Sequence, residues 1–425
     1  MSLAQGDSET FRASLSSDLL THLLQIDVNE DRLISKIVRG FLISGTQTTK
    51  GPARVAFVEN DHSAQIKLDF ALHSISRQHG RSHLEHGVDV DIDTTSQTQT
   101  IANKIFFLDP LALTADSTQC VSATTLNLNS VSANASGLTR LGRALKSKIA
   151  VNRVTRRFQE NRRAQEADIS RDTESQTCQL VDEKATEFLV AANEDYRQIF
   201  FEPLFEANSM QDALRFRTSS NHLYASVISD PGALATLAPP TPIDSLLSIR
   251  LHQSLINKLL SKELSGITLD EIELKDLFRN SGLYIHDSHE AFTADNLVLR
   301  FCDQTPIHFG FDKNKIQVEF CARSLRLRGK NLGSAILSAH YDLVPLPNGA
   351  LELNQTEQFR VEFSSDTTAS DMDRQTITQR YGRIFPKKMA TGPIAIATKK
   401  NPGAELKLIH TMASTGWLSF DWLLN

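Results

Sequence analysis

The chain has 425 residues, of which 40% are hydrophobic and 22% are charged, and its net charge is −5. This composition is typical of a soluble globular protein of two or three domains. The acidic balance argues against a dedicated nucleic-acid-binding protein. No stretch approaches the roughly 20 apolar residues that a membrane-spanning helix needs.

The first half predicts a helix, a run of strands and two further helices. Apolar residues recur at three- and four-residue steps over 10–43, which predicts a helix with a turn near 27–31. Polar and apolar residues then alternate between Val55 and Leu128, a pattern that predicts strands with one buried face. Two more helices are predicted over 139–163 and about 180–205, separated by a polar stretch.

The second half repeats this order of elements. Residues 237–242 (LAPPTP) are the best linker in the chain, because prolines favour an extended spacer. Residues 245–260 predict a helix that is apolar on more than one side, capped by Asp244 or Ser245. The other predicted elements are a strand at 214–227, a meander of alternating strands over 307–363, a helix at 374–385, and strands near 406–409 and 417–422.

The sequence therefore predicts an α+β protein of two related halves, in effect an internal repeat. Each half would be a curled antiparallel β-meander packed on an apolar helix, and a helical segment would join the two. We expect a helix/β-meander/basic-helix unit over residues 1–163. A helical connector with a strand and the proline-rich linker would span 164–242, and a helix/β-meander unit would span 243–425.

An apolar helix beside a curled sheet predicts a groove that can hold an apolar ligand. Burial of apolar surface contributes about 25 cal/mol per Å², so an incompletely filled groove favours a guest such as lipid. The alternative is that the protein's own side chains fill it. The residues expected to line this groove are Leu247, Leu251, Leu255, Leu259, Phe309, Phe311 and Phe320.

Histidines and carboxylates are concentrated in residues 73–93. Imidazole and carboxylate together suit zinc or another divalent ion, so a metal-dependent hydrolase is one functional hypothesis. The spacing matches no standard metal motif, and we therefore expect a polar hairpin loop over 77–87, the exposed face of a strand, and no metal site. The residues concerned are His73, His79, His83, Glu85, His86, Asp89, Asp91 and Asp93.

Other catalytic motifs are absent or incomplete. Residues 284–290 contain the side chains of a hydrolase triad, but no GxSxG elbow exists, and a solvated loop is the simpler interpretation. There is no GxxxxGK[ST] and no GxGxxG, which excludes the usual phosphate-binding loops. We expect no catalytic residue and no cofactor.

The helix predicted over 139–163 is strongly basic, with Glu160 as its single acidic residue. Such a helix can bind anionic lipid headgroups or nucleic acid. Charged helix faces are more often simply solvated, and we expect acidic residues that follow closely to neutralise this one. They are Glu166, Asp168, Asp172, Glu174, Asp182 and Glu183.

The four cysteines, Cys120, Cys178, Cys302 and Cys321, form no Cys-x-x-Cys pair, which argues against structural zinc. Cys302 and Cys321 fall in neighbouring predicted strands and are candidates for a disulfide. Buried free thiols are the alternative for all four.

Four segments of the second half carry a resemblance: SLLSIRLHQSLINKLL (245–260), PIHFGFDKNKIQVEFCARSLRLRG (306–329), RYGRIFPKKM (380–389) and GWLSFDW (416–422). With these segments the chain resembles a family of uncharacterised exported bacterial proteins, which implies an exported or periplasmic protein without a known activity. Lys387 and Lys388 depart from the acidic residues expected there. In layout alone, the doubled plan is similar to tubular lipid-binding proteins of the bactericidal/permeability-increasing type.

We therefore predict a non-catalytic exported binding or structural protein, with an apolar small molecule such as lipid held passively against residues 245–260. We expect no nucleic-acid partner and no transmembrane segment. The alternative is a cell-envelope protein–protein interaction module that binds through the exposed faces and edges of its sheets.

Overall fold

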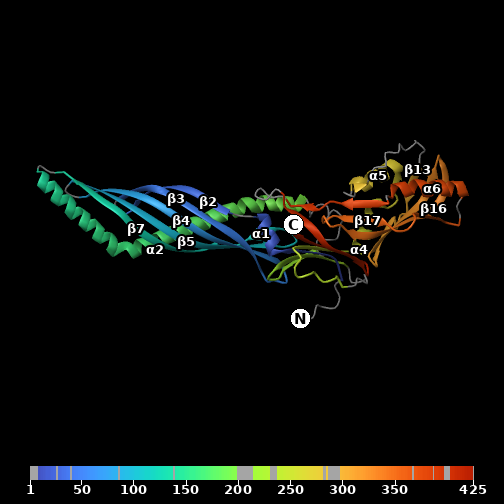
Figure 1. The fold of residues 1–425 in the computed structure, drawn as a ribbon, viewed down its shortest axis with the longest axis horizontal. Helices are drawn as coiled ribbons and strands as arrows, with labels where there is room; N and C mark the ends of the chain where they lie inside the picture. Colours follow the sequence, from blue (N-terminus) through green and yellow to red (C-terminus); the bar gives the residue numbers. More distant parts are fainter. Residues whose placement is uncertain are drawn as a thin grey trace. The chain divides into compact units, whose positions relative to one another are not determined.

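The computed structural model describes residues 8–24, 27–38, 41–84, 87–136, 139–198, 214–229, 237–280, 284–285, 297–365, 368–385, 387–396 and 403–424. It confirms the α+β class with antiparallel sheets (Figure 1). The chain divides into two compact units. The helix–sheet unit comprises Leu20–Phe201 and Thr218–Asn221, and the two-sheet unit comprises Met1–Leu19, Glu202–Arg217 and His222–Asn425. The three-part division expected from the sequence, and the internal repeat, stay predictions.

The helix–sheet unit contains one antiparallel sheet and the long helix α2 (Arg140–Tyr196). The strand order is β2-β3-β4-β5-β6, and β7 also pairs with β5. Figure 1 shows α2 running along this sheet, from the end at which β7 finishes. The strands are β2 (Asp27–Val38), β3 (Phe41–Val58), β4 (Ala64–Leu84), β5 (Val88–Leu108), β6 (Leu113–Ala115) and β7 (Gln119–Ala135).

The alternation predicted for these strands sets which face meets α2. Toward the end of α2, its residue Ala185 packs in a cluster with Leu68, Phe70 and Phe106 of the sheet. Near its start, Ala150 packs in a second cluster with buried valines of β5. The apolar contacts of the sheet with α2 thus gather at two places along the helix.

Two helix predictions in the first half are wrong. Residues 10–43 form β1 (Ser8–Ser16), the short helix α1 (Ser17–Leu24) and β2. β-branched residues such as Ile34, Ile37 and Val38 favour a strand, and here pairing with β3 decides their conformation. The polar stretch 164–177 does not break a helix but lies inside α2, because it contains no glycine or proline and is rich in helix-forming residues.

The two-sheet unit contains a seven-stranded sheet, β20-β21-β22-β10-β1-β9-β8, which joins strands from both ends of the chain. Its strands are β1, β8 (Leu214–Thr218), β9 (His222–Ser229), β10 (Leu247–His252), β20 (Ile394–Ala395), β21 (Glu405–Ser414) and β22 (Trp417–Leu424).

A nine-stranded sheet, ordered β11-β13-β15-β16-β17-β19-β12, also belongs to this unit, with β14 paired to β15 and β18 paired to β16. The helices are α4 (Gln253–Leu264), α5 (Glu271–Asn280) and α6 (Asp371–Ile384). The strands are β11 (Thr268–Asp270), β12 (Tyr284–Ile285), β13 (Leu297–Phe301), β14 (Ile307–Asp312), β15 (Lys315–Leu327), β16 (Lys330–Pro345), β17 (Leu351–Gln355), β18 (Arg360–Phe363) and β19 (Lys388–Thr391).

The helix predicted over 245–260 is wrong in its first part. Residues Leu247–His252 form β10, which pairs with β1 and β22, and α4 begins only at Gln253. The sequence alternates apolar and polar residues here, and the polar ones, Ser248, Arg250 and His252, are the buried ones. The sequence interpretation missed this strand because its buried face is polar, whereas an alternating pattern is usually taken to bury its apolar side.

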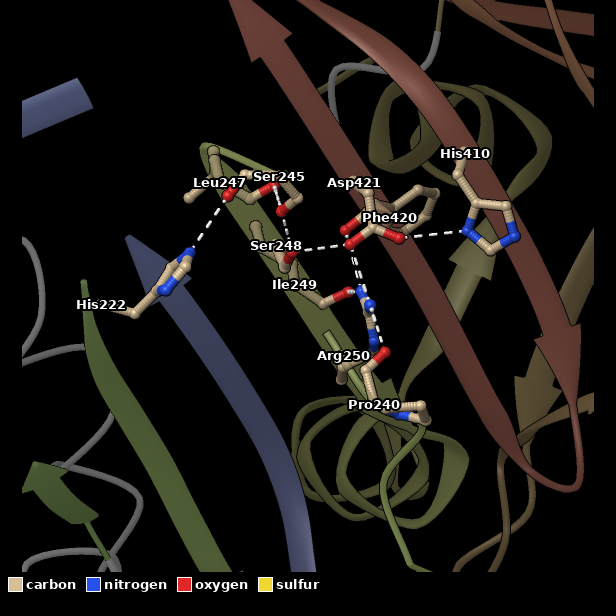
Figure 2. A network of polar contacts seen from close by, with 10 residues as sticks. All are labelled: His222, Pro240, Ser245, Leu247, Ser248, Ile249, Arg250, His410, Phe420 and Asp421. Carbon is tan, nitrogen blue, oxygen red and sulfur yellow. Dashed lines mark hydrogen bonds and ion pairs between the residues drawn. The ribbon is translucent and has the colours of Figure 1, made fainter. Parts of the chain in front are cut away.

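Arg250 and Asp421 form a buried ion pair on this face (Figure 2). Their side chains are 2% and 0% exposed, and Arg250 Nη2 lies 2.8 Å from Asp421 Oδ1. Arg250 also donates to the carbonyls of Phe420 and Pro240, while Asp421 accepts from Ser248 and contacts His410 Nδ1. A buried ion pair offsets its desolvation cost only when such further bonds satisfy its members.

Replacing Asp421 with alanine should leave the Arg250 charge buried without a counter-ion. We expect the Asp421→Ala variant to lose about 3–5 kcal/mol of unfolding free energy, measured by urea denaturation. The control is Glu357→Ala, which breaks the more exposed pair of Glu357 with Arg360 and should cost less than about 1 kcal/mol. Equal losses in the two variants would contradict the importance of the buried pair.

Two disulfides fasten the chain, Cys302–Cys321 and Cys120–Cys178. The first confirms the pair that the sequence nominated, and the free-thiol alternative is wrong. Disulfides of this kind are typical of proteins outside the reducing cytosol. No helix within the described ranges is long and apolar enough to span a membrane.

Candidate ligand-binding cavity

The helix α2 is fixed to the sheet along the edge strand β7. That strand pairs with β5 on one side, which leaves backbone N–H groups free on the other. Three carboxylates of α2, eight residues apart, accept hydrogen bonds from N–H groups four residues apart, two on this edge and one on Thr118, just before β7. Eight helical residues rise about 12 Å and four strand residues about 13 Å, so helix and strand stay in register. The pairs are Glu166 with Leu126 (2.9 Å), Glu174 with Ser122 (2.6 Å) and Asp182 with Thr118 (3.0 Å).

The same contacts shift the pKa values of two carboxyls. The backbone N–H of Leu126 is the main cause that lowers the pKa of Glu166, with Arg162 adding to it. Burial acts to raise the pKa of Asp182, but hydrogen bonds from Lys104 and Thr118 together outweigh it, and the pKa is lowered. The disulfide Cys120–Cys178 ties the same strand to the same helix.

Acid should therefore loosen α2 from β7. A carboxyl whose pKa is lowered by folding stabilises the fold above its unfolded pKa, about 4, and this stabilisation is lost as the pH falls through that value toward the lower folded one. We expect the unfolding free energy to fall between about pH 5 and pH 3. In the Glu166→Gln/Asp182→Asn variant the slope should be shallower and the stability at pH 7 lower, as measured by denaturation at each pH. An unchanged slope would contradict the assignment.

Two adjoining cavities, of about 380 Å³ and 220 Å³, lie between α2 and the inner face of the sheet. Lys36, Gln78, Ile169 and Asp172 line both. The larger cavity has mainly apolar walls, formed by Ile43, Ile92, Leu126, Phe158 and Ile169. The smaller has mainly hydroxyl and amide walls, with residues 32–35 of β2 along one side. The hydroxyl and amide residues are Gln47, Ser74, Ser76, Ser96, Thr98, Thr173 and Gln176.

Small polar residues in the middle of the inner face make this space. Leu68, Phe70 and Leu72 fill the interior of β4, but the next inward-facing positions are Ser74 and Ser76, whose short side chains leave room beside α2. Many of the neighbouring hydroxyls bond to one another, with Thr98 to Thr124 at 2.9 Å, Thr100 to Ser122 at 2.8 Å and Thr49 to Ser74 at 2.8 Å.

One polar atom in the larger cavity lacks a partner. Gln165 Oε1 is buried and accepts no hydrogen bond, although Gln165 lines the cavity wall. A buried acceptor left unpaired costs about 1–3 kcal/mol. A ligand that donates a hydrogen bond to this oxygen would recover that cost.

An ion pair joins the free edge of the sheet to α2 beside both cavities. Lys36 Nζ of β2 lies 2.6 Å from Asp172 Oδ2 of α2. Since α2 is held at the β7 edge, this pair links the opposite edge to the helix. Both side chains are more than a third exposed, so the pair is weak and can open.

The acidic residues expected to neutralise the basic helix mostly bind elsewhere, and that prediction is wrong for the start of α2. Asp172 pairs with Lys36 and Asp182 with Lys104, while Glu174 binds the β7 edge. Glu166 and Asp168 do pair with basic residues, but with Arg162 and Arg171, toward the middle of the helix. Within one helix an acidic side chain reaches basic residues only three or four positions away, so none of these acids reaches the basic residues from Arg140 to Arg153.

The groove residues predicted from the sequence lie in the two-sheet unit and line neither cavity. Leu247 and Leu251 are half-buried on β10, whereas Leu255 on α4 is buried and Leu259 half-buried. Phe311 and Phe320 are buried and Phe309 is half-buried, and the Asn257 side chain of α4 bonds the backbone of Phe309. The structure thus brings α4 and β14 together, while ligand binding there stays a prediction.

The sequence analysis did not predict that the hydroxyl residues of β4 and β5 line a cavity. A signal existed: Ser74 and Ser76, and Ser96 and Thr98, continue the buried alternation of two long strands with hydroxyl side chains. Such positions can equally be interpreted as a solvated face, and only the pairing of β4 with β5 and the cover of α2 shows that they are inside.

The histidine and aspartate cluster lies on the opposite, exposed face as cross-strand pairs. His79 Nδ1 is 2.8 Å from Asp93, Arg81 Nε is 2.8 Å from Asp91, and His83 Nδ1 is 2.6 Å from Asp89. Within the described residues no group of three or more potential ligands could hold a metal ion. The predicted exposed strand face is confirmed, but the hairpin loop over 77–87 is wrong, because β4 runs to Leu84. Glu85 and His86 lie outside the described residues.

The triad-like stretch 284–290 is described only at Tyr284 and Ile285. These two residues form β12, which pairs with β19. The other members of the stretch lie outside the described residues.

Comparisons with known proteins give no family. No protein-family model matches the sequence, and no curated protein matches it. A solved lipopolysaccharide binding protein aligns at 9% identity over 98% of this chain and 99% of its own, with a TM-score of 0.34. The structure of P47 from Clostridium botulinum A2 aligns at 8% identity over 98% of each chain, with a TM-score of 0.25. Scores at this level do not establish a shared fold, so the resemblances drawn from the sequence stay predictions.

Proposed function

We propose that this protein is a non-catalytic binding protein that holds one amphipathic, lipid-like molecule between α2 and the inner face of its sheet. The observation that carries the proposal is the pair of adjoining cavities, one with apolar walls and one with hydroxyl walls. Ligand pockets typically measure about 300–1,000 Å³ and combine apolar walls with a few polar groups.

Each cavity would hold a different part of such a ligand, the larger its acyl segment and the smaller its polar end. An acyl segment against Ile92, Leu126 and Phe158 would gain about 0.8 kcal/mol for each buried CH₂ group. A polar end in the smaller cavity would bond the hydroxyls of β4 and β5. A hydrogen-bond donor on the part of the ligand in the larger cavity would bond the Gln165 oxygen. Binding of this kind is passive and needs no proton transfer.

Blocking the smaller cavity should abolish binding. Ser96 lines it, whereas the neighbouring Gln97 is exposed on the opposite face. We expect Ser96→Trp to lose uptake of a fluorescent fatty acid and any lipid that copurifies in native mass spectrometry, because the indole fills the space. The matched control Gln97→Trp should bind as the parent does. Equal uptake by both variants, each shown to be folded by circular dichroism, would overturn the proposal, as would no uptake by the parent.

Breaking the Lys36–Asp172 pair should speed exchange of the ligand. An exposed ion pair stabilises a closed arrangement by at most about 1 kcal/mol, so Lys36→Ala should release the fluorescent fatty acid up to about five-fold faster in stopped-flow measurements. The control is Lys67→Ala, which removes another exposed pair, with Asp69, outside both cavity walls. If Lys67→Ala changed the release rate as much, the pair would have no special role.

The sequence-predicted groove of Leu247, Leu251, Leu255, Leu259, Phe309, Phe311 and Phe320 is retained as a second proposed contact site for an apolar ligand. Binding that persists in Ser96→Trp would favour it. We also propose that the protein is exported or periplasmic. The two disulfides support this, because such bonds persist in oxidising compartments.

A further inference from the structure

The first turns of α2 stand clear of the sheet. Every residue from Thr139 to Lys146 is exposed, and the first buried residue of the helix is Ala150. Ala150 follows Leu141 by nine residues, which is two and a half helical turns, so the two lie on opposite sides. The face of this segment that carries Leu141 is therefore directed away from the sheet.

This outer face carries an apolar row. Leu141, Leu145 and Ile149 are 86%, 60% and 58% exposed. Their four-residue spacing places them along one line of the helix. These three large branched side chains belong to neither of the two apolar clusters described above, and their exposure to water is unfavourable.

The segment of α2 that carries the apolar row is also strongly basic. Between Arg140 and Gln159 the helix has seven basic residues and no acidic one. Among the described residues, Arg156 forms an ion pair with Glu160 at 2.8 Å. Five others of the seven form no ion pair with a described residue: Arg140, Arg143, Lys146, Lys148 and Arg153. The start of α2 therefore combines an exposed apolar row with a concentrated positive charge.

We infer that residues 140–157 of α2 dock the helix–sheet unit on an anionic membrane surface. Helices that lie in a bilayer interface pair an apolar face with flanking lysines and arginines, which attract anionic headgroups while the apolar side chains enter the acyl boundary. Nucleic acid would match the charge but not the apolar row, because phosphate contacts need no exposed leucine. The surface is separate from the cavities, so the inference stands apart from the ligand proposed for them.

The test is sedimentation of the full chain with vesicles of phosphatidylcholine alone or with phosphatidylserine added to about a third, near physiological salt. We expect binding to the phosphatidylserine vesicles only, weakened by added salt because the attraction is electrostatic. Leu141→Glu/Leu145→Glu should lose binding at least ten-fold. Leu111→Glu is the control, because Leu111 is a comparably exposed leucine, 71% exposed, in the loop after β5, and it should bind as the parent does.

Each other outcome decides against the inference. Equal binding to both vesicle types, no binding, or equal loss in the Leu111→Glu control would overturn it. Tighter binding to duplex DNA than to vesicles, unaffected by Leu141→Glu/Leu145→Glu, would assign the surface to nucleic acid instead. The cavity-blocked Ser96→Trp variant should still sediment with anionic vesicles, which separates failure of this inference from failure of the cavity proposal.

Discussion

The helix–sheet unit depends on how the free edge of β7 is satisfied. A strand edge exposes unpaired N–H groups, which invite pairing with another chain. Here Glu166 and Glu174 of α2 accept from that edge, and Asp182 accepts from Thr118 just before it, at every second turn of the helix. The match between the rise of a helix and the length of a strand makes this repeat possible over a long distance. The helix is thereby held by charged hydrogen bonds as well as by apolar packing.

Because α2 is attached in this way, the space between α2 and the middle of the sheet does not have to be filled by side chains. Because apolar clusters and the edge bonds hold α2, the central hydroxyl residues need not fill the interior. A well-packed core would tolerate no such space, since voids there cost stability. The cavities therefore lie where neither the apolar clusters nor the edge hydrogen bonds require α2 to contact the sheet.

Buried polar groups shape both units in different ways. In the two-sheet unit, Arg250 and Asp421 are closed in by carbonyls and a serine hydroxyl, an arrangement that fixes β10 against β22 but leaves no access for a substrate. In the helix–sheet unit, hydroxyls border open space, and the Gln165 oxygen has no partner. Buried side-chain atoms without a hydrogen-bond partner occur in both units, Arg250 Nε among them. The Gln165 oxygen differs from Arg250 Nε because its residue lines a cavity wall, where the proposed ligand would reach it.

The sequence by itself determined the α+β class and the alternating strands, because alternation is a local property of the chain. It made Cys302 and Cys321 candidates for a disulfide, and the structure decided between that bond and free thiols. It misjudged residues 10–43 and 247–252, where pairing with distant strands overrides local periodicity. The apolar groove that it placed around Leu247 and Phe309 stays a prediction. The acids that it expected to neutralise the basic helix form no ion pair with the start of α2. Only the tertiary structure decided that Ser74 and Ser96 are internal and that Glu174 meets Ser122, because those contacts join residues far apart in sequence. Spacing along a chain fixes which side chains share a face, but the partner of that face is set by packing.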